Sequence, residues 1–114
     1  MSLGEQIASR RIKEKRTIEV PEWGEDNVPL ILYTSAITAG DINKLQRKHK
    51  NFLNDMTVDG MVDLIIMKAE TKDGEKAFTL VDKPFLMNEE VGIIASLSAK
   101  MFGETVSVEE QEKN

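Results

Sequence analysis

Residues 17–33 read TIEVPEWGEDNVPLILY, and this stretch decides the fold class. Polar and apolar residues alternate over 17–20 and again from Val28 to Leu30, with an apolar run continuing to Tyr33, and this period of two predicts two β-strands. The intervening residues 21–27 are rich in turn formers, so we expect a β-hairpin with a loose loop. Pro29 cannot donate a backbone hydrogen bond, which places its strand at a sheet edge or starts it at Leu30.

A first helix is predicted to begin at Thr38-Ala39-Gly40-Asp41, which resembles a capping box. We expect it to continue to Met56, because six of its side chains fall within an arc of about 100°, the width of one core-facing stripe. The basic side chains of the same helix point away from this stripe. The stripe consists of Ile42, Leu45, His49, Phe52, Leu53 and Met56, and the basic residues are Lys44, Arg47, Lys48 and Lys50.

A second helix is predicted from its cap at Thr57 to about Glu70, with Asp59 in the first turn. Its apolar residues extend well beyond one stripe, so we expect this helix to pack on more than one side. Residues 72–75 then predict a turn, residues 77–80 a short extended segment, and Pro84 a break.

A third helix is predicted between a cap at Asn88 and a stop near Gly103. Its apolar residues occupy about 200° of the circumference, roughly twice what one core face needs. The surplus makes this helix a candidate interface, although burial within the domain or in a homo-oligomer explains it equally well. The apolar set is Val91, Ile93, Ile94, Ala95, Leu97, Met101 and Phe102.

The predicted fold class is therefore α+β, an N-terminal β-hairpin followed by three main α-helices with a short extended segment between the second and third. The 114 residues suit one domain, which we place at 17–103. Residues 1–16 form a basic N-terminal arm, and residues 104–114 form an acidic C-terminal tail. No stretch approaches the roughly 18 apolar residues of a membrane span, and the charged N-terminus lacks the apolar core of a secretory signal.

The residue inventory argues against catalysis and against a cofactor or metal site. The chain has no cysteine and one histidine, His49, which lies on the apolar stripe and is expected to be a partly buried structural residue. Asp59 and Asp63 share one helix face and are expected to be solvated rather than an acid–base pair. No glycine-rich phosphate loop is present in the sequence, and Trp23 is expected to be a lid over the core more than a recognition residue.

Taken in order, several features resemble the tail assembly chaperones of long-tailed bacteriophages. The resemblance covers most of residues 17–114 and lies in the ordered set rather than in any single motif. Lys83-Pro84-Phe85-Leu86 departs from it, because such proteins are expected to be acidic and continuously helical there. The matching features are Val20-Pro21-Glu22-Trp23-Gly24 before a β-run, Thr38-Ala39-Gly40-Asp41 opening a helix, Asp73-Gly74-Glu75-Lys76-Ala77-Phe78-Thr79, and an apolar helix over 89–102 followed by a Glu-rich end with Lys113-Asn114.

This resemblance implies a non-catalytic role in the host bacterial cytoplasm. Chaperone copies would coat the long helical tape-measure protein, keep it soluble and help to recruit tail-tube protein subunits. Six methionines suit adaptable binding of a helix, although methionine also fills ordinary cores. The residues expected to bind the partner are Ile93, Leu97, Met101, Phe102 and Trp23.

The alternative function is a small nucleic-acid-associated regulator that uses Lys44, Arg47 and Lys48. Clustered basic side chains favour it, but the net charge of −5 and the absence of interleaved aromatic residues do not. Asp59 and Asp63 would also repel phosphates from the second helix. We therefore expect binding to protein rather than to nucleic acid.

Overall fold

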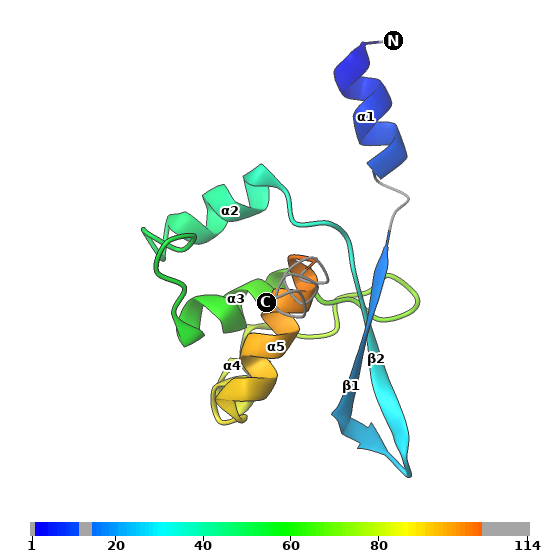
Figure 1. Ribbon diagram of the computed structural model, residues 1–114, viewed down its shortest axis with the longest axis vertical. Helices are drawn as coiled ribbons and strands as arrows, with labels where there is room; N and C mark the ends of the chain where they lie inside the picture. Colours follow the sequence, from blue (N-terminus) through cyan, green and yellow to red (C-terminus); the bar gives the residue numbers. More distant parts are fainter. Residues whose placement is uncertain (1, 12–14, 104–114) are drawn as a thin grey trace, which may run out of the picture.

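The computed structural model describes residues 2–11 and 15–103, and its architecture is α+β (Figure 1). A two-stranded antiparallel hairpin and a group of helices form the body, and helix α1 stands apart from it. The α+β class is confirmed, but residues 2–11 and 15–103 form five α-helices and a 3-10 helix rather than three main helices. The elements are α1 (Leu3–Arg11), β1 (Arg16–Glu25), β2 (Val28–Thr34), α2 (Ala39–Gln46), α3 (Val58–Lys68), the 3-10 helix η1 (Leu80–Asp82), α4 (Lys83–Met87) and α5 (Val91–Met101).

Helix α1 lies in the segment that we expected to be a basic arm. It begins with a reciprocal cap, in which the Ser2 hydroxyl accepts from the Glu5 N–H and the Glu5 carboxylate accepts from the Ser2 N–H, each at 3.1 Å. This Ser-x-x-Glu capping box is a local signal in the sequence that our interpretation missed. The predicted acidic tail, residues 104–114, lies outside the described residues.

The hairpin is confirmed, but its connection is a tight turn and a bulge rather than a loose loop. Asp26 and Asn27 have φ angles of 53° and 66°, as a type I′ turn requires, and short polar side chains tolerate this conformation. Val20 pairs with Leu30 and Glu25 pairs with Val28, so residues 21–24 of β1 bulge opposite a single residue of β2.

The core lies between one face of the hairpin, α3 and α5. Ile18, Val20 and Leu32 point from the hairpin into this core, and α3 packs against both α4 and α5. Helix α3 is the second helix that we predicted, and the expectation that it packs on more than one side is confirmed. Its fully or almost fully buried residues include Val62, Leu64, Ile65 and Ile66.

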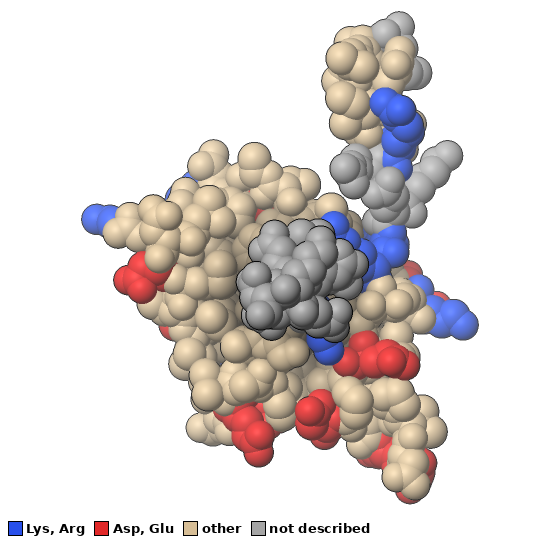
Figure 2. Space-filling view, viewed as in Figure 1, with Lys and Arg blue, Asp and Glu red and all other residues tan. Residues whose placement is uncertain are grey.

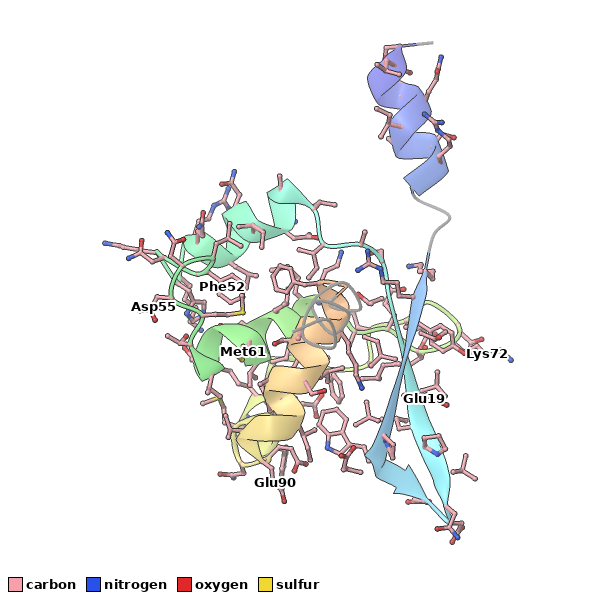
Figure 3. All side chains as sticks on the ribbon, in the orientation of Figure 1. Glu19, Phe52, Asp55, Met61, Lys72 and Glu90 are labelled. Carbon is pink, nitrogen blue, oxygen red and sulfur yellow. The ribbon has the colours of Figure 1, made fainter. Side chains whose placement is uncertain are left out.

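Helix α2 begins as predicted and ends ten residues early. The capping box at Thr38 and Asp41 is present, with hydrogen bonds of 2.9 and 3.1 Å. The helix stops at Gln46, and turns follow up to residue 55. Phe52 is fully buried beside α3 (labelled in Figure 3), whereas Leu53 is 55 % exposed, so the continuous stripe through Leu53 was wrong.

Three further expectations about the C-terminal half need correction. Pro84 does not break the chain but lies in the first turn of α4, where a missing N–H costs no helical hydrogen bond. Helix α5 is capped at Glu90 rather than Asn88, and Gly103 follows its end with a φ of 80°. The short extended segment predicted over 77–80 forms no regular strand: Thr79 has an extended backbone, but Leu80 already begins η1. Next to this segment, Lys76 makes an isolated bridge to Glu70.

The longest helices in the described ranges, α3 and α5, have 11 residues each. No helix of that part of the chain is long and apolar enough to cross a membrane.

Candidate functional site

The apolar surface of α5 that we predicted to bind a partner is mostly covered by the chain itself. Leu97 is 2 % exposed and Met101 is 0 % exposed, and both belong to the core. Ile93 and Phe102 are half-buried, and the Phe102 ring stacks on Phe52 with the centroids 6.4 Å apart. The wide apolar circumference of this helix therefore serves packing, and Leu97 and Met101 present no surface to a partner.

Trp23 projects from the bulge of β1 and has partners on two sides. Its Nε1 donates to Glu89 Oε2 at 2.8 Å, and its ring meets Phe78 edge-on with the centroids 5.9 Å apart. The bulge therefore directs this indole onto the segment before η1 and onto the residues before α5. This geometry supports the lid interpretation, because the polar end of the ring is already satisfied within the domain.

A group of strongly exposed apolar residues lies instead between η1 and the first turn of α5. Leu80, Val81, Phe85 and Val91 are 71 %, 78 %, 74 % and 61 % exposed, and we call these four residues the apolar patch. In α4 only Leu86 is buried, so this short helix turns Leu86 inward and Phe85 outward. All four lie within residues 80–91, and exposed apolar patches mark binding surfaces in soluble proteins.

Sequence reasoning missed the apolar patch. Its signal was the run of large apolar residues around Pro84, which we interpreted only as a chain break. Residues 80–87 are LVDKPFLM, and five apolar side chains beside a proline cannot all reach the core from one short helix. That observation could have identified an apolar surface without the structure.

The basic residues of the alternative function are exposed, as expected. Lys44, Arg47 and Lys48 lie on α2 and the turn that follows it, and the Lys48 ammonium lies 3.3 Å from Asp63 Oδ2. Figure 2 shows that most acidic side chains on its visible face lie toward the end of the molecule with α4, the start of α5 and the hairpin tip. Basic side chains lie along α1, near the start of β1 and at the edge beside α2.

A compact ionic cluster joins the loop before α3, α3 itself and α4. The Lys83 ammonium lies 2.7 Å from Asp59 Oδ1 and 2.9 Å from Asp63 Oδ1. His49 Nε2 lies 2.8 Å from Asp63 Oδ2, and His49 Nδ1 lies 3.9 Å from Asp59 Oδ2. The Asp63 side chain is only 13 % exposed, so the expectation of a solvated Asp63 was wrong. The partly buried His49 that we expected is confirmed.

The partners of this cluster set its ionisation. Burial alone would raise the pKa of Asp63, but hydrogen bonds from His49, Lys83 and Lys48 outweigh burial and hold that pKa below its usual value. The pKa of Lys83 is raised above its usual value, chiefly by its bond to Asp59, with Asp63 adding to the effect against partial desolvation. Both groups are therefore charged at neutral pH, and the cluster ties α4 to α3.

The ligand atoms of His49, Asp59 and Asp63 lie within 4.8 Å of one another, a spacing that could hold a metal ion. The Lys83 ammonium already bridges both carboxylates from 2.7 and 2.9 Å, so a cation would have to displace a positively charged side chain. Both ring nitrogens of His49 face carboxylates, which leaves neither directed at a nucleophilic hydroxyl. The arrangement therefore suits a structural tie better than a metal centre or a catalytic pair.

A second tie lies at the other end of α3. The Lys68 ammonium lies 2.9 Å from Asp41 Oδ2 and donates to the Ser35 hydroxyl at 2.9 Å. Burial raises the pKa of Asp41, but the hydrogen bonds from Thr38 and Lys68 outweigh it and hold the pKa low. The capping carboxylate of α2 thus also anchors the end of α3.

Two hollows border the hairpin. One of about 420 Å³ lies between β1 and α5, where Ile18, Val20 and Leu97 contribute to its wall. Another of about 450 Å³ lies beside β2, next to Tyr33, Thr71 and Phe78.

Comparison of this chain with protein-family models, with curated proteins and with solved structures found no match.

Proposed function

We propose that this protein is a non-catalytic protein-binding domain that acts as a tail assembly chaperone of a long-tailed bacteriophage. Its partner in this proposal is an amphipathic helical segment of the tape-measure protein, which docks on the apolar patch. Recruitment of tail-tube protein in the host bacterial cytoplasm belongs to the same proposal. The resemblance in the sequence supplies the identity of the partner, and the apolar patch supplies the surface.

The observation that carries the proposal is the exposure of Leu80, Val81, Phe85 and Val91, each more than half accessible to solvent. Burying a large apolar side chain contributes roughly 1.5–3 kcal/mol, so several such residues together can support binding of an apolar helix face. The ionic cluster of Lys83, Asp59 and Asp63 holds α4 on α3 beneath this patch. A rigid support of this kind reduces the entropy cost of binding.

The non-catalytic part of the proposal rests on the ionic groups and on their partners. His49 Nε2 lies 2.8 Å from Asp63 Oδ2, and the Lys83 ammonium lies 2.9 Å from Asp63 Oδ1. No phosphate-binding glycine loop occurs in the sequence. A catalytic base must be within hydrogen-bond reach of a proton on the substrate, whereas His49 and Asp63 are directed at each other and at Lys83.

Co-purification with the product of a long helical reading frame immediately downstream in the genome tests the proposal. Phe85→Asp places a charge within the patch, and we expect it to abolish co-purification while the fold is retained, because Phe85 is 74 % exposed. Leu53→Asp is the matched control, because Leu53 is an exposed apolar residue outside the patch. Equal recovery of the partner with both variants would show that the patch is not its binding surface.

A further inference from the structure

The outer edge of β1 offers unpaired backbone groups. Tyr33 of β2 exchanges both of its backbone hydrogen bonds with Glu70, at 2.9 and 2.7 Å, so its N–H and C=O point away from β1. Thr17 is paired with Tyr33, and Glu19 is paired with Ile31 two residues along. Because hydrogen-bonded and non-bonded pairs alternate in an antiparallel ladder, the N–H and C=O groups of Thr17 and Glu19 point away from β2.

No described residue pairs with these outward groups. The backbone bonds outside the regular elements include none from Thr17 or Glu19 among residues 2–11 and 15–103. Pro21 is the next outward position and has no N–H, so the free edge offers donors only over a short stretch. Proteins often limit strand addition at an open edge in this way.

Helix α5 faces this edge across the hollow of about 420 Å³. Ile18, Val20, Ile93 and Leu97 supply its apolar lining, and all four are buried or half-buried. The 11 residues of α5 span roughly 16 Å at 1.5 Å per residue, enough to flank a strand of about five residues at 3.3 Å each. Gly92 leaves the helix side open, since a Cβ built there would have no atom within 4 Å.

The rim of this groove is acidic. Glu19 and Glu22 on β1 and Glu90 before α5 are exposed along it, together with the ammonium of Lys100. At the end of α5, the Arg16 guanidinium is already bonded to the Met101 carbonyl oxygen at 2.9 Å. Glu19 and Glu90, labelled in Figure 3, lie on the strand and at the start of the helix, respectively. Three carboxylates on the rim favour a ligand with positive charges.

We infer that the groove between β1 and α5 binds an extended peptide that alternates basic and apolar residues and adds to β1 as a third strand. Its backbone bonds to Thr17 and Glu19, its apolar side chains enter the groove, and its Lys or Arg side chains meet the carboxylates of the rim. Backbone pairing supplies affinity in such strand addition, and the alternate side chains supply specificity. This site shares no residue with the apolar patch, and the two adjoin at the start of α5, where Val91 lies between Glu90 and Gly92.

The test uses the full chain and a fluorescein-labelled hexapeptide with alternating lysine and valine, measured by anisotropy. We expect saturable binding, with backbone amide shifts of Thr17 and Glu19 in NMR spectra. Two control peptides separate the contributions: one carries glutamate in place of lysine, and the other is methylated on the alternate backbone nitrogens that would face β1. Both controls should bind at least tenfold more weakly.

Two variants of the protein test the groove and its rim. Gly92→Phe places a ring in the open space of the groove, and we expect it to keep the melting temperature of the protein while weakening binding of the lysine peptide at least tenfold. Glu22→Lys reverses one charge of the rim and should weaken binding of the same peptide several-fold, by a smaller factor at high salt. Phe85→Asp, in the apolar patch, should bind the peptide normally. Absence of peptide binding, equal binding by the methylated peptide, or unchanged binding to the Gly92→Phe variant would overturn the inference.

Discussion

Gly24 and Gly92 differ in the space around them: a side chain at Gly24 would clash with the backbone, whereas a side chain at Gly92 would meet no atom within 4 Å. A Cβ at Gly24 would lie 1.9 Å from the Val28 carbonyl oxygen and 2.8 Å from the Pro29 Cα, both backbone atoms that cannot rotate away. The bulge that directs Trp23 inward therefore depends on the missing side chain. Gly92 has open space around it.

We predict that Gly24→Ala destabilises the protein by about 2–3 kcal/mol, because the bulge has to shift to accommodate the methyl group. Gly92→Ala should instead stabilise it by about 0.4–1 kcal/mol, because alanine lowers the entropy of the unfolded chain and favours the helix. Urea unfolding of both variants measures the two effects. A Gly24→Ala variant as stable as the wild type would contradict the described bulge.

Asp63 makes the stability of the protein depend on pH. Its pKa in the folded state is depressed below the value of 3.8 expected in an unfolded chain, so its contribution is present above that value and is lost as the pH falls through the folded pKa. We predict that Asp63→Asn costs about 1.5–3 kcal/mol at pH 7, the range for hydrogen bonds to charged groups. The difference from wild type should hold down to about pH 4.5 and shrink below pH 4.

Unfolding free energies between pH 7 and pH 2.5 check this prediction. Asp55→Asn serves as the control, because Asp55 is exposed and in no described ion pair, and it should leave the curve near that of wild type. A constant difference between wild type and Asp63→Asn down to pH 2.5 would show that Asp63 is not the group that titrates.

At the level of elements, the turns between α2 and α3 place two adjacent residues in opposite environments. Phe52 is fully buried and packs against Gly60, where a Cβ would lie 2.8 Å from the phenyl ring. Leu53 points to solvent. A helix continuing to Met56 would place both side chains on the core-facing stripe.

We predict that Phe52→Ala costs about 3–5 kcal/mol and Leu53→Ala less than about 0.5 kcal/mol. The reason is that the first change leaves a cavity between the loop, α3 and Phe102, whereas the second removes only solvated surface. Thermal and chemical unfolding distinguish the two. Similar losses of unfolding free energy for both variants would indicate that Phe52 and Leu53 are both buried, as in a continuous helix, and would contradict the turns.

The elements that sequence reasoning predicted correctly are those with local signals. The hairpin follows from the alternation over 17–20, and the starts of α2 and α3 follow from caps at Thr38 and Thr57 whose hydroxyls bond within the same turn. The end of α2 depends on Phe52 reaching the core beside Gly60, a contact that periodicity does not contain. Amphipathic spacing over 47–56 was therefore overridden by tertiary packing.

The candidate site was less predictable, because its determinants come from distant parts of the chain. In the sequence, Asp63 has the pattern of a solvated residue, because its partner Lys83 lies 20 positions later in the chain and contacts it from α4. The wide apolar face of α5 resembled an interface because the coverage of Leu97 and Met101 by the rest of the fold was not visible in one helix. Trp23 over the core, the partly buried His49 and the exposed Lys44, Arg47 and Lys48 are residues whose surroundings the sequence suggested correctly.

At the scale of the whole molecule, α1 and the body are separate in space (Figure 1), and Leu3 and Ile7 of α1 are exposed. We predict that deleting residues 1–11 changes the free energy of unfolding by less than about 0.5 kcal/mol, since no core contact is removed. Arg16→Gln should cost more, because Arg16 Nη1 donates to the Met101 carbonyl oxygen at 2.9 Å and ties β1 to the end of α5. A large loss on deletion would mean that α1 packs on the body.

We propose that the molecule binds a helical partner through the apolar patch on η1, α4 and the start of α5. Hydrogen–deuterium exchange of the chain, alone and with the tape-measure protein from the same genome, tests this binding surface. We predict protection of backbone amides concentrated in residues 80–91, with the loop around Leu53 unchanged. Absence of protection in residues 80–91 in a complex that has demonstrably formed would contradict it.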